Sequence, residues 1–234
     1  YIANKREIEN AICSFIDNDE QTEKKYREMS KLLTDPNIIN NSEEIKQIVL
    51  IISNISDNHH RNPNFFTKIG QILQLIKNEI KANLTNHDIW NIFKNNRLTL
   101  LLLLKENVIT IDNQIISDIK SSDDCNSMEI DEFFSPELGN NKYTNLSISL
   151  ETFLEYRDKG ENSEYICELI RNDSVEEFIT YINKNNISIN SRINESKFET
   201  NLFLIGQKPL LIEYSAFFGS IQIFKYLQMN EAKM

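Results

Sequence analysis

The scarcity of glycine and proline is the sequence feature that most constrains this fold. The 234 residues include five glycines and four prolines, against average frequencies of about 7% and about 5%. An all-β sandwich, or an α/β nucleotide-binding fold with glycine-rich loops, requires more turn glycines than this. Because 40% of the residues are hydrophobic, the chain can bury a core and is not a disordered polypeptide. The composition therefore predicts an all-α protein.

Apolar residues recur at helical spacing through residues 1–119, which we predict to form a helical domain. The first stripe predicts a helix over residues 3–17, and the last predicted helix covers about 110–119. Leu98–Leu104 is apolar nearly all round, which indicates a buried central helix. The other stripes are Tyr26, Met29, Leu32 and Leu33; Ile45, Ile48, Val49, Ile52 and Ile55; Phe66, Ile69, Leu73, Ile76 and Ile80; and Ile89, Trp90, Ile92 and Phe93. Helices joined by short polar segments are typical of an antiparallel helical bundle or solenoid.

Residues typical of helix N-termini precede three of these stripes. Asn41 stands three residues before Glu44, and Thr85 stands three residues before Asp88, which is the spacing of a capping box. Asn62–Pro63 offers a cap residue followed by proline at the first helical position. We therefore expect helices to begin directly after these residues.

Residues 120–148 lose the helical periodicity and are rich in turn-forming residues, so we predict a linker there. Residues 117–177 carry 16 of the 35 acidic residues and 5 of the 25 basic ones, which makes this linker acidic. The acidic stretch is interpreted as a solvated face, with an acidic docking site as the open alternative. Phe133 and Phe134 are expected to hold the linker against a neighbouring surface. Since no basic stripe is present and the net charge is −10, nucleic-acid binding is disfavoured.

The last third, residues 149–234, contains one layout twice. Residues 165–183 read as a short helix, a tight turn near Asn172–Asp173 and a second helix, and residues 210–227 repeat this arrangement. The second copy has Ser-Ala-Phe-Phe-Gly at 215–219, where small residues allow two helices to approach and Gly219 permits a left-handed turn. In the first copy aspartate takes the place of that glycine.

These two copies resemble degenerate ankyrin repeats. The step at 215–219 is similar to the Ala-Ala-x-x-Gly step of that family, and Ile223, Phe224 and Leu227 match its apolar second helix. Residues 187–190 look like the hairpin finger of an ankyrin repeat. The departures are Leu-Leu-Ile-Glu at 210–213 in place of Thr-Pro-Leu-His, and a spacing of 46 residues from Asp173 to Gly219 against the ankyrin period of 33. An unrelated helical hairpin is the alternative.

A helical domain followed by degenerate repeats also resembles the Asn- and Ile-rich ankyrin families of parasitic protists, which carry an uncharacterised N-terminal helical domain. The resemblance implies a non-enzymatic scaffold that binds another protein, with the Ile187–Ser191 finger and Glu213 as candidate contacts. The alternative function is a structural domain that self-associates and carries the repeats. Because about three stacked units are needed for stability, two repeats must either continue past Met234 or lean on the helical domain. A first residue of Tyr1 rather than methionine also predicts a fragment of a longer protein.

No catalytic, cofactor-binding or metal-binding residues are predicted. The three histidines are His59, His60 and His87, and no spaced set of ligands surrounds them. Phosphate-binding and nucleophile motifs are absent from the sequence. Three cysteines, Cys13, Cys125 and Cys167, form no pattern of paired spacings, which favours a reducing cytoplasm. The longest apolar run is far shorter than the roughly 20 residues of a membrane-spanning helix, so no membrane insertion is expected.

Overall fold

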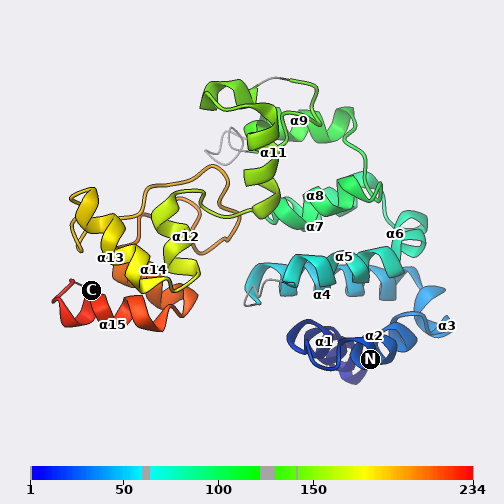
Figure 1. The fold of residues 1–234 in the computed structure, drawn as a ribbon. Coiled ribbons are helices and arrows are strands. Elements are labelled where there is room, and N and C mark those ends of the chain that lie inside the picture. Colours follow the sequence, from blue (N-terminus) through cyan, green and yellow to red (C-terminus); the bar gives the residue numbers. More distant parts are fainter. Residues whose placement is uncertain (1, 60–63, 122–129, 141, 234) are drawn as a thin grey trace. The chain divides into compact units, whose positions relative to one another are not determined.

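The computed structural model describes residues 2–59, 64–121, 130–140 and 142–233. These residues form α-helices and one 3-10 helix, with no β-strand among them beyond an isolated antiparallel bridge between Arg192 and Leu210. The predicted all-α fold class is therefore confirmed. The chain divides into two compact units, Tyr1–Lys142 and Tyr143–Met234, which are coloured blue to green and green to red in Figure 1.

The first unit is built from helices that lie in successive layers (Figure 1). α1 packs on α2, α4 and α5, while α4 packs on α7, and α5 packs on α8. α7 in turn contacts α8 and α9. The helices are α1 (Ile2–Asp17), α2 (Thr22–Leu33), α3 (Pro36–Ile39), α4 (Ser42–Asn58), α5 (Phe65–Leu75), α6 (Lys77–Asn83), α7 (Asn86–Phe93), α8 (Arg97–Lys105) and α9 (Asn113–Ser121).

The predicted apolar stripes form one continuous core in this unit. Ile12, Phe15 and Ile16 of α1 are fully buried, as are Ile48 and Ile52 of α4. The helix predicted at Leu98–Leu104 is α8, in which four of the five leucines from 98 to 103 are buried. Most of this core thus consists of the apolar faces that helical periodicity predicts, as expected for layered amphipathic helices.

Two of the three predicted helix caps are present. The Asn41 side chain accepts hydrogen bonds from the backbone of Glu43 and Glu44 at the start of α4. Thr85 and Asp88 form a reciprocal capping box at the start of α7. The third prediction, at Asn62–Pro63, lies outside the described residues.

The helix predicted from Phe66 to Ile80 is wrong in one respect, because it is two helices. Ile76 leaves helical geometry, with φ −112° and ψ 19°, so α5 ends and α6 begins there. Ile76 and Ile80 are nevertheless fully buried. The break allows α6 to pack against α4 while α5 packs against α1 and α8, which is a tertiary requirement that the stripe does not encode.

Part of the predicted linker belongs to the first unit. Phe133 and Phe134 are buried in its core, with ring centroids 5.0 Å apart. Residues 130–133 are helical, so the segment near them is packed rather than solvated. Residues 122–129, which hold Asp123, Asp124 and Cys125, lie outside the described part of the chain. The division between the units at residues 142 and 143 falls inside the predicted linker.

The second unit contains two helix-turn-helix pairs, preceded by a 3-10 helix and one α-helix (Figure 1). We call α12 with α13 the first pair and α14 with α15 the second pair. The two helices of each pair pack together, and α12 also packs on α14 while α13 packs on α15. The elements are η1 (Lys142–Leu146), α11 (Leu150–Lys159), α12 (Tyr165–Arg171), α13 (Val175–Lys184), α14 (Leu211–Phe218) and α15 (Ile221–Met229).

Candidate functional site

The two pairs turn in the same way at equivalent positions. Asp173 has φ +50° and Gly219 has φ +68°, so both occupy the left-handed region between their helices. The amide that follows each turn donates to the carbonyl five residues earlier, from Ser174 to Leu169 at 3.0 Å and from Ser220 to Ser215 at 2.9 Å. Positions 46 residues apart are therefore structurally equivalent, as the sequence layout predicts.

Polar side chains join the first pair to the second. The Asp173 carboxylate accepts hydrogen bonds from the backbone amides of Gln222 at 3.0 Å and Ile223 at 2.9 Å. The Ser220 hydroxyl donates to the carbonyl of Ile170, and Arg171 Nη1 donates to the Tyr214 hydroxyl at 3.0 Å. The pairs are thus connected by directional contacts in addition to apolar packing.

The outer side of the second pair is uncovered. In the first pair, Ile170, Phe178 and Ile182 are buried, and the Phe178 ring meets Tyr226 of α15. Their equivalents in the second pair are Ala216, Phe224 and Gln228, of which the first and last are exposed and Phe224 is half-buried. Phe217 and Ile221 are 40% and 60% exposed beside them. We name the surface formed by Ala216, Phe217, Ile221, Phe224 and Gln228 the rear face.

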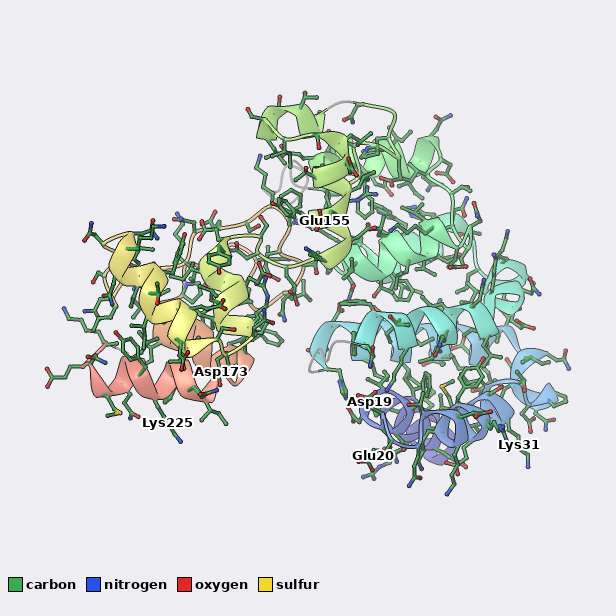
Figure 2. The ribbon with its side chains drawn as sticks, in the orientation of Figure 1. Asp19, Glu20, Lys31, Glu155, Asp173 and Lys225 are labelled. Carbon is green, nitrogen blue, oxygen red and sulfur yellow. The ribbon has the colours of Figure 1, made fainter. Side chains whose placement is uncertain are left out.

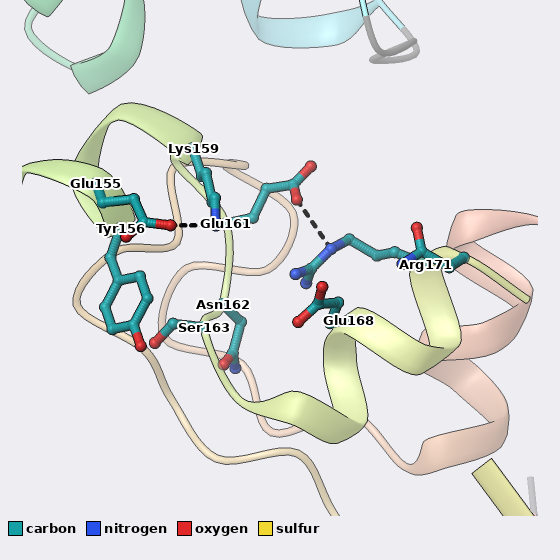
Figure 3. Close-up of a pocket in the computed structure, with 9 residues that line it drawn as sticks. Glu155, Tyr156, Lys159, Glu161, Asn162, Ser163, Glu168 and Arg171 are labelled. Atoms are coloured by element: carbon teal, nitrogen blue, oxygen red, sulfur yellow. Dashed lines mark hydrogen bonds and ion pairs between the residues drawn. The ribbon is translucent and has the colours of Figure 1, made fainter. Parts of the chain in front are cut away.

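The second unit also contains a polar cavity between α11 and α12 (Figure 3). Its volume is about 430 Å³. Figure 3 shows charged side chains from both helices and from the intervening loop around it. The lining residues are Glu155, Tyr156, Lys159, Glu161, Asn162, Ser163, Glu168, Arg171 and Asn172.

The segment that connects α13 to α14, residues 185–210, holds the loop that borders this cavity. α11 ends at Gly160 in the left-handed region, and the Gly160 carbonyl accepts bonds from the Thr200 amide at 3.1 Å and hydroxyl at 2.7 Å. Asn162 is buried, and its side chain donates to the Asn194 carbonyl at 2.9 Å. Phe198 packs against Tyr156, with ring centroids 5.4 Å apart. The long connection thus has a structural role, because it holds the α11–α12 loop in place.

Two ion pairs line the cavity. Lys159 Nζ lies 2.9 Å from Glu155 Oε1, and this hydrogen bond raises the pKa of Lys159. Arg171 Nε lies 2.8 Å from Glu161 Oε2, and this arginine is largely buried. In the described part of the chain Glu168 forms no ion pair, although Figure 3 shows its carboxylate next to Arg171. The cavity lining therefore carries three carboxylates and two basic groups, and the third carboxylate, Glu168, is exposed and lies beside Arg171.

The residues that the sequence suggested as contacts lie elsewhere. Glu213 is exposed, and its carboxylate accepts a hydrogen bond from the Leu210 amide at 2.7 Å, which caps α14. In the Ile187–Ser191 segment, Ile187 and Ile189 pack against the apolar core of the unit, while Ser188 and Asn190 are exposed. Neither lines the cavity. Sequence reasoning missed the cavity, whose only signal was an acidic excess spread across residues 117–177.

The histidines and cysteines have structural surroundings. His59 Nε2 lies 3.3 Å from Asp17 and His87 Nδ1 lies 3.2 Å from Asp118, all within the first unit. Burial raises the pKa of the Cys167 thiol to about 12. Among the described residues no three His, Cys, Asp or Glu side chains are grouped as metal ligands would be. His60 and Cys125 lie outside those residues.

No family model, curated protein or solved structure matches this chain. The resemblance to ankyrin repeats therefore stays a prediction from the sequence. Throughout the described helices, none combines the length and the apolar character that crossing a bilayer requires.

Proposed function

We propose that this chain is a non-enzymatic scaffold for protein–protein interaction, in which a helical unit precedes the first pairs of a degenerate ankyrin-type stack. The observation that carries this proposal is the rear face. The equivalent surface of the first pair is buried by a following pair, whereas Phe217 and Ile221 leave the second pair apolar and exposed.

Stacked repeats explain why such a face exists. Each helix pair buries its apolar side only against a neighbour, so the last pair of an incomplete stack exposes the side that its neighbour would cover. An exposed apolar surface of this kind is a site for protein association. The free, buried Cys167 fits a reducing compartment, and we place the protein in the cytoplasm.

The alternative function is self-association through the same kind of surface. Lys225, which is exposed on α15, occupies the position of Ile179 in the first pair. A two-fold contact through α15 would bring two such lysines near each other and would be weakened by their repulsion. This charge favours a different protein as the partner over a second copy.

An Ile221→Asp variant tests the proposal, with Phe203→Asp as the matched control. Both side chains are 60% exposed, but Phe203 lies in the connecting segment and not on the rear face. We expect a protein captured saturably from native extract to be lost with Ile221→Asp and retained with Phe203→Asp, while both variants melt as the wild type does. Equal capture by both variants would remove the rear face from recognition. Concentration-dependent sedimentation abolished by Ile221→Asp would establish self-association instead.

A further inference from the structure

We propose that the cavity between α11 and α12 binds a cationic side chain, arginine or lysine, of a partner protein. This inference rests on the proposed function, since it assumes that the ligand belongs to another protein. It assigns a chemical class of ligand to a site that is separate from the rear face, because no residue lines both.

The charge around the cavity selects a cation. Glu155 and Glu161 pair with Lys159 and Arg171, and Glu168 adds a third carboxylate, so the cavity lining carries three acidic and two basic side chains. Residues 150–172 carry six acidic and three basic side chains, which extends the negative field beyond the cavity. A guanidinium or ammonium group that reaches the exposed carboxylate of Glu168 gains a charge-assisted hydrogen bond.

The same arrangement disfavours an anion. Lys159 and Arg171 would have to exchange their glutamate partners for the ligand, and Arg171 also donates to the Tyr214 hydroxyl at 3.0 Å. A carboxylate or phosphate near Arg171 would additionally meet the Glu168 charge shown beside it in Figure 3. Repulsion between like charges at close range makes such a ligand unfavourable.

The size and rigidity of the site fit one side chain. The volume of about 430 Å³ falls in the range of ordinary ligand pockets, roughly 300–1,000 Å³. The loop between α11 and α12, which contributes Glu161 and Asn162 to the lining, is held by the bonds of Thr200 to Gly160 and of Asn162 to Asn194. The Tyr156 ring lines the opposite wall and offers an aromatic surface to the stem or charge of the ligand.

The test uses the full chain and two small probes of the same shape. Nα-acetyl-arginine amide carries the guanidinium, and Nα-acetyl-citrulline amide replaces it with a neutral urea. In an amide NMR titration we expect the arginine probe to shift the resonances of Glu161, Glu168 and Arg171 saturably. The citrulline probe should bind at least about five-fold more weakly, as expected for loss of a partly exposed charge contact.

Glu168→Gln is the decisive variant and Glu176→Gln is its control. Glu176 is exposed in the first turn of α13 and does not line the cavity. We expect Glu168→Gln to weaken arginine binding at least about five-fold, and Glu176→Gln to leave it unchanged. Equal binding of both probes, equal effects of both variants, or saturable binding of inorganic phosphate would each overturn the inference. If the wild-type chain does not bind the arginine probe but still captures a partner through Ile221, this site alone is refuted. If it binds the probe but captures no partner, the proposed function alone is refuted.

Discussion

The Asp173 carboxylate caps a helix of the following pair, with its Oδ1 atom 2.9 Å from the Ile223 amide. The other oxygen accepts from Gln222 at 3.0 Å. Figure 2 shows Asp173 beside α15. Asp173 itself lies in the turn between the two helices of the first pair. One residue therefore has two functions, because it occupies a left-handed turn in its own pair and satisfies the helix N-terminus of the next.

Replacing Asp173 separates these two functions. We expect Asp173→Ala to destabilise the second unit by about 2 kcal/mol. The variant loses both hydrogen bonds to the start of α15, and alanine at φ +50° lacks the local bonding that lets aspartate adopt this conformation. Asp173→Gly loses the caps but relieves the backbone strain, so it should cost about 1 kcal/mol. Urea unfolding measures both. A Gly variant as unstable as the Ala variant would contradict the strain contribution.

Gly219→Val should destabilise the second unit by about 2 kcal/mol, because valine is strongly disfavoured at φ +68°. A Cβ at this position meets no atom within 4 Å, so the cost at Cβ is conformational and not a clash. Gly70→Ala is the control. Gly70 lies inside α5 with equally open space, and its replacement should stabilise the protein by about 0.5–1 kcal/mol. A Gly219→Val variant with the same melting temperature as the wild type would argue against the left-handed turn at this position.

Lys68 supports the first unit from inside its core. It is 4% exposed, and Nζ donates to the Ile16 carbonyl at 2.9 Å and to Asp19 at 2.6 Å. Lys68→Met keeps the apolar stem but removes the hydrogen bonds from Nζ to the Ile16 carbonyl and to Asp19. We expect a loss of about 1–2 kcal/mol in unfolding free energy. Thermal unfolding monitored by circular dichroism checks this, with exposed Lys31→Met of α2 as the control.

The same contact predicts a pH dependence. The hydrogen bond from Lys68 lowers the pKa of Asp19 below its usual value, which is about 3.9 in an unfolded chain. Its stabilising contribution is therefore complete above that pH and is lost as the pH falls through the lowered pKa of the folded state. Asp19→Asn should flatten the acid limb of the stability curve below about pH 4. An unchanged acid limb would show that the pair is not coupled to folding.

Cys167 should be unreactive while the second unit is folded. Burial raises its thiol pKa to about 12, so at pH 8 the thiolate fraction falls roughly a thousand-fold below that of a free cysteine. We expect a Cys13→Ser, Cys125→Ser variant to react with a thiol reagent only at the rate of unfolding. Rapid labelling in native buffer would mean that α12 opens far more readily than its packing indicates.

Local sequence signals predicted much of the architecture. The stripe within residues 3–17 and the stripe beginning at Ile45 are buried helix faces, and the spacing from Thr85 to Asp88 is a capping box. Such features depend on residues a few positions apart, which the sequence displays directly. The break at Ile76 was missed because it follows from what α5 and α6 pack against.

The candidate sites depended on contacts between distant residues. The loop that borders the cavity is held by a hydrogen bond from Thr200 to the Gly160 carbonyl, across 40 residues. The apolar periodicity of the sequence does not predict such a bond. Glu213 was a candidate contact from its place on a first helix, and the structure adds that its exposed carboxylate caps its own helix.

The sequence by itself determined that this chain is helical, where two of its helices begin, and that two segments share one layout, because apolar spacing and cap chemistry act over one or two turns. Only the tertiary structure decided which faces are covered and which carboxylates find partners. Burial and ion pairing arise when residues far apart in the chain approach one another, so Phe178 is fully buried and Phe224 only half-buried, although both are phenylalanines at equivalent positions of the two pairs.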